Sequence, residues 1–201
     1  MTLDDALFEH LFPRFKTIGE FSLLLSVLAD AFSLQLRDIE QYIDKVKAAI
    51  SISDSFDLVI FSILLLAKER EPELYRQIVS LELSLRNDSK KSVSNIGFYE
   101  RFKSNKELGF YLPWENNSSE LLKAEVSISK YIGCFFFSIK NKAQLVAAKE
   151  AVSIGGVLGK YSIDSFAEAR HEEALLAYYL ANQNININDY QDLVELACNL
   201  K

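Results

Sequence analysis

Apolar residues follow a helical spacing over a long stretch of the chain, residues 17–50. They recur at every third or fourth position, at Ile18, Phe21, Leu25, Leu28, Phe32, Leu36, Ile39, Ile43, Val46 and Ile50. This spacing places them on one face of an α-helix. Thr17 and Glu20 fit a capping box at its start. One helix of this length would extend about 50 Å, so the pattern predicts a helix that crosses the body or projects from it. Only Ser33 and Gln35 weaken the pattern, and a bend would fall there.

Shorter segments repeat the same helical spacing along the rest of the chain. The predicted helices lie at about 2–12, 55–70, 72–86, 98–106, 118–139, 141–152, 165–182 and 188–201. The run LVIFSILLLA at 58–67 is apolar on every side, so its helix is expected at the centre of a bundle. Seven Gly and three Pro are too few turn residues for an all-β fold. We therefore predict a mostly α, single-domain bundle of six to eight helices over residues 1–201, with a loop-rich insertion at about 87–118.

Residues 124–139 leave a second fold class open. The segments EVSIS and CFFFSI within them are rich in residues that favour strands. If strands form, 124–139 and 156–163 would pair into a small sheet and the class would become α+β. The helical period extends over more residues and favours the helix.

Charge and composition narrow the classes of function. The net charge of −6 and the pI of about 5.1 give an acidic surface that repels phosphate, so we expect no general nucleic-acid binding. The longest apolar runs are shorter than the about 20 residues of a membrane-spanning helix, so we expect no membrane insertion. The acidic N-terminus does not resemble a signal peptide, and Cys134 and Cys198 are expected to be reduced thiols. These features predict a cytoplasmic protein, and we expect no cofactor.

One short motif carries potential metal or acid–base chemistry. Glu168 and His171 are spaced so that both side chains share one helical face, as in di-iron helical bundles. Such a site needs a second motif of the same kind, and the other histidine, His10, has Leu7 at the corresponding position. The favoured interpretation is an exposed charged face, because Arg170, Glu172 and Glu173 lie in the same turn.

Basic residues are concentrated between positions 86 and 106. Six basic and two acidic residues give this segment +4, which leaves −10 for the remainder of the chain. Aromatic residues lie in and after the segment, and aromatic and arginine side chains are the usual anchors of protein interfaces. The predicted partner-binding residues are Tyr99, Arg101, Phe102, Lys103, Tyr111 and Trp114. The alternatives are aromatic core residues with solvating lysines, or a stacking surface for single-stranded nucleic acid.

Three functions follow from these patterns. The first is a non-enzymatic, cytoplasmic protein–protein interaction module that uses the basic–aromatic segment 98–114, in an inhibitor, immunity-type or adaptor role. The second is an enzyme of helical fold with a metal or acid–base site around Glu168 and His171. The third is a homodimeric scaffold built on the helix at 17–50.

Overall fold

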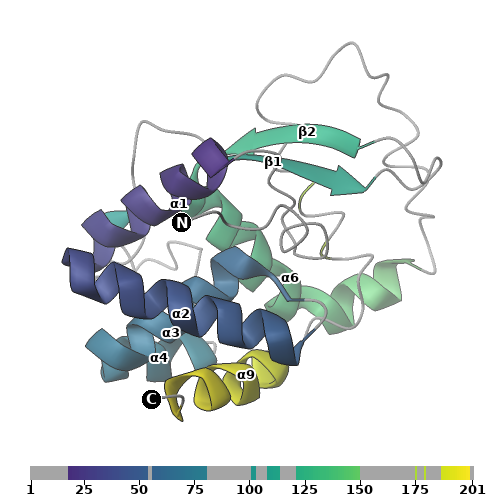
Figure 1. The fold of residues 1–201 in the computed structure, drawn as a ribbon. Helices are drawn as coiled ribbons and strands as arrows, with labels where there is room; N and C mark the ends of the chain where they lie inside the picture. The colour runs from purple at the N-terminus through teal and green to yellow at the C-terminus, as the bar shows by residue number, and fades with distance from the viewer. Residues whose placement is uncertain are drawn as a thin grey trace.

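The protein is mostly α-helical, as the sequence predicts. The computed structural model describes residues 18–53, 56–80, 101–102, 108–113, 121–149, 175, 179 and 187–199. Within these residues lie α1 (Ile18–Phe32), α2 (Leu36–Ile52), α3 (Leu58–Arg70), α4 (Pro72–Val79), β1 (Leu108–Pro113), β2 (Leu121–Val126), α6 (Ile128–Lys149) and α9 (Ile187–Asn199). The strand pair lies at one end of the helical body, beside α1 (Figure 1). None of the helices in the described ranges is both long enough and apolar enough to cross a membrane.

Helix α3 is the centre of the core. Every residue from Leu58 to Ala67 is buried, as expected for a helix that is apolar on all sides. Helices α1, α2, α4 and α9 surround α3 (Figure 1), and α1, α4 and α9 are its principal neighbours. The side chain of Asp57 caps the helix by accepting the backbone N–H of Ile60.

The chain turns sharply between α1 and α2, so the single long helix predicted over 17–50 is wrong, while the position of the possible bend, at Ser33 and Gln35, is confirmed. Ser33 has a φ of 53°, a left-handed conformation that is uncommon outside glycine. The N–H of Leu34 donates to the carbonyl of Ala29 at 2.9 Å, which closes the end of α1. The carboxylate of Asp38 then accepts the N–H of Gln35 at 2.9 Å and opens α2. We call residues 33–35 the elbow.

Strands form in a region where the sequence predicted irregular chain and a helix. β1 and β2 pair antiparallel, with Leu108 opposite Val126 and Pro113 opposite Leu121. The helix predicted to begin near residue 118 is therefore wrong over β2. The alternative sheet of 124–139 with 156–163 is also wrong for residues 128–139, which are helical, while 156–163 lie outside the described residues. The local patterns missed the hairpin because it depends on pairing across the intervening residues.

Helix α6 joins two segments that the sequence divided. The hydroxyl of Ser127 accepts the N–H of Lys130 at 3.4 Å, and its carbonyl accepts that of Tyr131 at 2.9 Å. The helix then continues to Lys149 without the break predicted near residue 140. Its buried side chains follow the helical spacing, at Ile128, Tyr131, Ile132, Phe135 and Phe136.

Three of the remaining predicted helices are confirmed where they are described, and the helix predicted at 98–106 is described only at residues 101 and 102. Helix α3 lies within the predicted 55–70, α4 begins at Pro72, and α9 matches the last predicted helix. The helices predicted at 2–12 and 165–182 lie outside the described residues, apart from Leu175 and Tyr179, which are helical and buried.

Candidate functional site

A buried carboxyl group lies at the N-terminal end of α3. Asp57 is 2% exposed, and its Oδ1 accepts the N–H of Ile60 at 3.0 Å. Its Oδ2 accepts two hydroxyls, from Tyr131 at 2.7 Å and from Tyr179 at 2.5 Å. The N–H of Asp57 in turn donates to the hydroxyl of Tyr190 at 3.0 Å. Both carboxyl oxygens therefore have donors, as a buried charged group requires.

The tyrosine rings around Asp57 also pack against one another. Tyr131 and Tyr179 meet edge to face, with their ring centroids 6.0 Å apart. Phe135 makes similar contacts with Tyr179 at 5.5 Å and with Tyr190 at 5.8 Å. We call Asp57, Tyr131, Tyr179 and Tyr190 the tyrosine cluster. It connects α3, α6, α9 and the helical position 179 at one point in the core.

Burial dominates the electrostatics of the tyrosine cluster. Loss of solvent raises the pKa of Asp57 to about 6, although the hydrogen bonds from Tyr179, Ile60 and Tyr131 lower it in part. Burial and the neighbouring charge of Asp57 raise the pKa of Tyr131 and Tyr179 well above the usual tyrosine value. A perturbed carboxyl is often a sign of an active site, but at 2% exposure Asp57 presents no surface to a substrate. We therefore interpret the tyrosine cluster as a structural site that stabilises the packing of these helices.

A second buried polar pair connects α2 to α3. The hydroxyls of Tyr42 and Ser62 are 2.5 Å apart. Ser62 also donates to the carbonyl of Leu58 at 2.5 Å. Burial raises the pKa of Tyr42, so its hydroxyl stays protonated and remains available as a donor.

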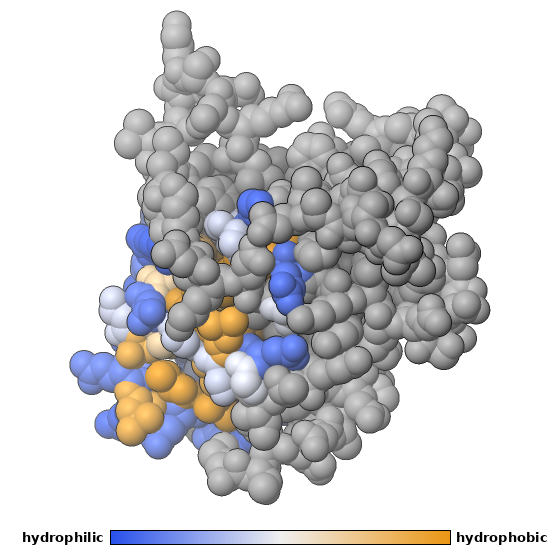
Figure 2. All heavy atoms as spheres, turned by 90° about the horizontal axis from the view of Figure 1, so that it is seen from above, coloured by the Kyte–Doolittle hydropathy of each residue, from blue (hydrophilic) through white to orange (hydrophobic). Residues whose placement is uncertain are grey.

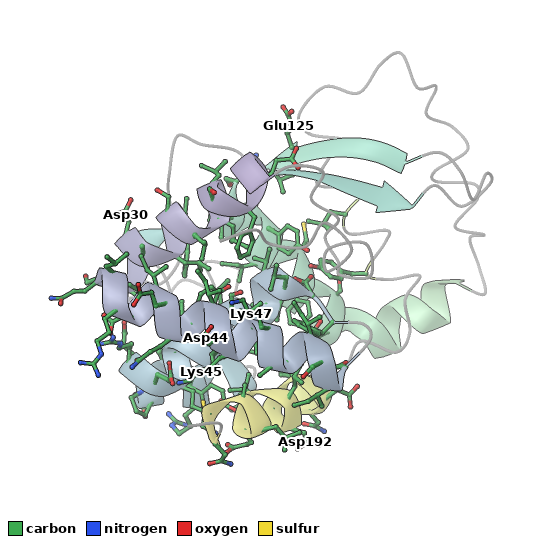
Figure 3. All side chains as sticks on the ribbon, in the orientation of Figure 1. Asp30, Asp44, Lys45, Lys47, Glu125 and Asp192 are labelled. Carbon is green, nitrogen blue, oxygen red and sulfur yellow. The ribbon has the colours of Figure 1, made fainter. Side chains whose placement is uncertain are left out.

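The C-terminal end of α3 is charged and lies at the surface. Each of residues 68–71 forms an ion pair with another segment: Lys68 with Glu195, Glu69 with Lys45, Arg70 with Asp38, and Glu71 with Arg101. Lys45 lies on the side of α2 that faces α3 and α4 (Figure 3). Lys68 and Arg70 are also well placed against the negative end of the α3 dipole. We call these four pairs the charged collar.

Two pairs of the collar converge on the elbow. The Arg70–Asp38 pair joins the end of α3 to the first turn of α2, and the Glu71–Arg101 pair brings in the segment at 101–102. We define the elbow corner as Leu36, Arg37, Asp38, Arg70, Glu71 and Arg101. Figure 2 shows the molecule from above, with the same left-hand side as Figure 1. Apolar side chains are exposed among hydrophilic ones on that side, which is also the side where α1 ends and α2 begins in Figure 1.

Among the residues whose side chains the structure describes, Leu36 is the most exposed large apolar one. It is 74% exposed, although its place in the helical pattern of the sequence assigned it to the apolar face. It begins α2, and the turn at the elbow carries it away from the core. Arg37 beside it is also exposed, and the side chains of Arg70 and Arg101 are 43% and 40% exposed.

The structure separates the predicted partner-binding residues. Phe102 is fully buried and meets Phe32 of α1 edge to face at 6.0 Å, so its prediction as a surface anchor is wrong. Arg101 is exposed and paired with Glu71. Tyr111 lies in β1, where its backbone is opposite Lys123. The predicted residues Tyr99, Lys103 and Trp114 lie outside the described residues.

The predicted metal or acid–base pair also lies outside the described part of the chain. Glu168 and His171 belong to a segment that the structure does not describe. Among the residues that it does describe, no group of three or more histidine, cysteine or acidic side chains could hold a metal ion. Both cysteines are partly buried and neither is in a disulfide, and burial raises the pKa of Cys198.

The residues that the sequence did not single out are Asp57, its three tyrosines and Leu36. Asp57 directly precedes the apolar run of α3, where a side chain that caps a helix is expected, and this signal could have identified it. No local signal identifies the tyrosines, because Tyr131 and Tyr179 are separated from Asp57 by 74 and 122 residues.

Comparisons of the chain with models of protein families, with curated proteins and with solved structures found no match.

Proposed function

We propose that the protein is a non-enzymatic protein–protein interaction module that binds its partner through the elbow corner. The observation that carries this proposal is the 74% exposure of Leu36. It is followed by the exposed Arg37, in the same first turn of α2 whose Asp38 pairs with Arg70. An exposed leucine is unremarkable by itself. An apolar side chain bordered by arginines matches the composition of protein interfaces, in which an apolar centre is surrounded by a polar rim.

The arginines of the corner are held in place and still have donors to offer. Arg70 and Arg101 each contact a carboxylate of the same chain, which fixes their orientation before any partner arrives. A guanidinium group carries five N–H donors, so such a pair leaves donors for another molecule. Preorganised side chains lose less conformational entropy on binding. The partner would have an apolar pocket that accepts Leu36 and acidic or carbonyl oxygens that face the arginines.

Phe102 supports this surface from below. Its buried ring contacts Phe32 at the end of α1, while its neighbour Arg101 pairs with Glu71. The predicted basic–aromatic segment is thereby attached to the elbow through residues 101 and 102. The proposal keeps Arg101 as a contact residue and gives Phe102 a structural role. Binding of this kind suits an adaptor or inhibitor.

Site-specific photo-crosslinking tests the proposal in the native cell. A benzophenone amino acid is placed at Leu36 and, as a matched control, at Ile52, which is 51% exposed at the other end of α2. We expect one discrete, stoichiometric adduct from position 36 and none from position 52. The Arg37→Glu variant should reduce the adduct, and Lys47→Glu, a charge reversal elsewhere on α2, should leave it unchanged. Equal labelling from both positions, or none from either, contradicts the proposal.

A further inference from the structure

The buried residues of α1 and α2 are spaced as if one continuous helix ran through both, although the elbow between them is not helical. Leu24 and Tyr42 are buried and 18 residues apart, as are Leu28 and Val46. Eighteen residues are about five whole turns at 3.6 residues per turn. A straight helix through the elbow would therefore carry one continuous apolar face, as the sequence predicted. The sequence only weakens this pattern, at Ser33 and Gln35, whereas the structure breaks the helix there.

The elbow contains the features that would favour straightening. Ser33 has the only positive φ among the described non-glycine residues, 53°, a conformation that helix formation would relieve. Leu36 is 74% exposed directly after the elbow, and its position falls at the edge of the continuous face in a straight helix. Short, strained hinges are the known starting points of domain exchange.

We propose that α1 is an exchangeable arm: residues 33–35 become helical, and α1 of a second copy of this chain takes the place of α1. The occupant is a second copy because the place is shaped for this helix. Phe21, Leu24, Val27, Leu28 and Phe32 bury their side chains there, against a surface that includes α3 and β1. An identical helix from another chain reproduces every one of these contacts, so exchange leaves the core unchanged.

This inference does not depend on the proposed function, but it affects the same place. Straightening the elbow would separate Phe32 from Phe102 of the same chain, and it would release the N–H of Gln35 from the carboxylate of Asp38, which pairs with Arg70. The monomer and the exchanged dimer would therefore present different surfaces at the elbow corner.

Two substitutions at Ser33 bias the equilibrium in opposite directions. Ser33→Ala favours the helical elbow, because alanine is the best helix former and disfavours a positive φ, whereas Ser33→Gly favours the closed elbow. Together the two preferences change the equilibrium between the closed and the helical elbow by about 30-fold between the two variants. A dimer opens two elbows, so the factor applies twice. We therefore expect the association constant of Ser33→Ala to exceed that of Ser33→Gly by about 10³-fold, with the natural chain between them.

The experiment uses the full chain, refolded at several concentrations and analysed by light scattering after gel filtration. The expected species are a monomer of 22.9 kDa and a dimer of twice that mass, with the dimer prevailing in Ser33→Ala. The pair Ser26→Ala and Ser26→Gly is the matched control, since Ser26 is exposed in the middle of α1. These two variants should show equal dimer fractions.

A distance within one chain distinguishes exchange from any other dimer. Spin labels at Ser22 and Ser51, both exposed, are introduced after Cys134 and Cys198 are replaced by alanine, and labelled chains are diluted with unlabelled ones. A straight helix places the labelled positions about 44 Å apart at 1.5 Å per residue, whereas the closed elbow folds them back to a much shorter distance. A Ser33→Ala dimer with the long distance supports the proposal. A dimer with only the short distance, or monomers for both variants at every concentration, overturns it.

Discussion

The two ends of α3 handle charge in opposite ways. At the N-terminal end a single carboxyl, that of Asp57, is fully enclosed and receives hydrogen bonds from two tyrosines and a backbone N–H. At the C-terminal end four residues in succession form ion pairs at the surface. Both ends connect α3 to other segments. A buried polar group is costly to leave without partners, whereas an exposed ion pair exchanges protein contacts for water at little cost.

The comparison assigns most of the stability to the buried end. The C-terminal end has four ion pairs and the N-terminal end has one carboxyl, so a count of interactions would assign more stability to the ion pairs. Each exposed pair, however, contributes only about 0–1 kcal/mol to the free energy of unfolding. The tyrosine cluster depends on complete hydrogen bonding, so the loss of one member leaves the others unsatisfied inside the core.

Removing the carboxyl should cause the largest loss. At pH 5 we expect Asp57→Ala to lower the free energy of unfolding by about 3–5 kcal/mol, because α3 loses its cap and two tyrosine hydroxyls lose their acceptor. Asp57→Asn keeps the shape and one oxygen, so it should lose clearly less. Chemical denaturation monitored by circular dichroism measures both. An Asp57→Ala loss below about 1 kcal/mol would contradict the buried role.

The pH dependence of stability should change when Asp57 is replaced. Its pKa is raised from 3.8 to about 6 in the folded protein, so the folded state holds the proton more tightly than the unfolded state. This contribution is fully present below pH 3.8 and is lost as the pH rises through about 6. Relative to Asp57→Asn, the natural chain should gain about 2–3 kcal/mol as the pH falls from 7.5 to 4.

The free energy of unfolding is measured against pH for the natural chain and for Asp57→Asn. The difference between the two proteins at each pH reports on Asp57, because they share all other titrating groups. Urea titrations at half-unit intervals of pH supply it. Parallel curves would show that Asp57 has an ordinary pKa in the folded protein.

Single tyrosine hydroxyls should have intermediate effects. Tyr179→Phe and Tyr131→Phe each remove one donor to Asp57 and keep the ring contacts with each other. We expect each to lower stability by about 1–2 kcal/mol. They should also raise the pKa of Asp57 further, which moves the pH-dependent step to higher pH. A substitution that changes neither quantity would mean that its hydrogen bond has no energetic role.

The charged collar should give the smallest effect. A double-mutant cycle on Lys45→Ala and Glu69→Ala should yield a coupling free energy of about 0.2–1 kcal/mol, and 1 M salt should reduce it. The pair Lys47–Asp44, which is more exposed and lies within α2, is the matched control and should give less. A coupling free energy above about 2 kcal/mol would mean that the collar stabilises the fold as strongly as the tyrosine cluster does.

Local patterns in the sequence predicted the parts of the fold that local physics decides. The apolar run of α3 predicted a central buried helix, Pro72 predicted the start of α4, and the pattern at 188–201 predicted the existence of α9. Each of these depends on residues within a few turns of one another. Of the candidate site, the sequence named Arg101 by its residue type; Arg101 is exposed, and its contact with a partner stays a prediction.

Other features required contacts between distant segments. The burial of Phe102 depends on Phe32, which lies 70 positions earlier in the chain. The strands β1 and β2 depend on each other, and the partners of Asp57 come from α6, α9 and position 179. Composition places these residues in apolar or aromatic stretches, but it does not specify which of them meet.

The elbow shows most clearly what the local sequence pattern determines and what tertiary contacts determine. By itself the sequence determined which faces of α1 and α2 are apolar, because helical spacing is a local property. It did not determine whether the two helices are collinear, since both arrangements keep the same faces apolar. The tertiary structure decided this through the packing of α1 on α3 and β1 and of Phe32 on Phe102. That burial outweighs the unfavourable φ at Ser33, because buried apolar area stabilises a fold by more than one strained residue destabilises it.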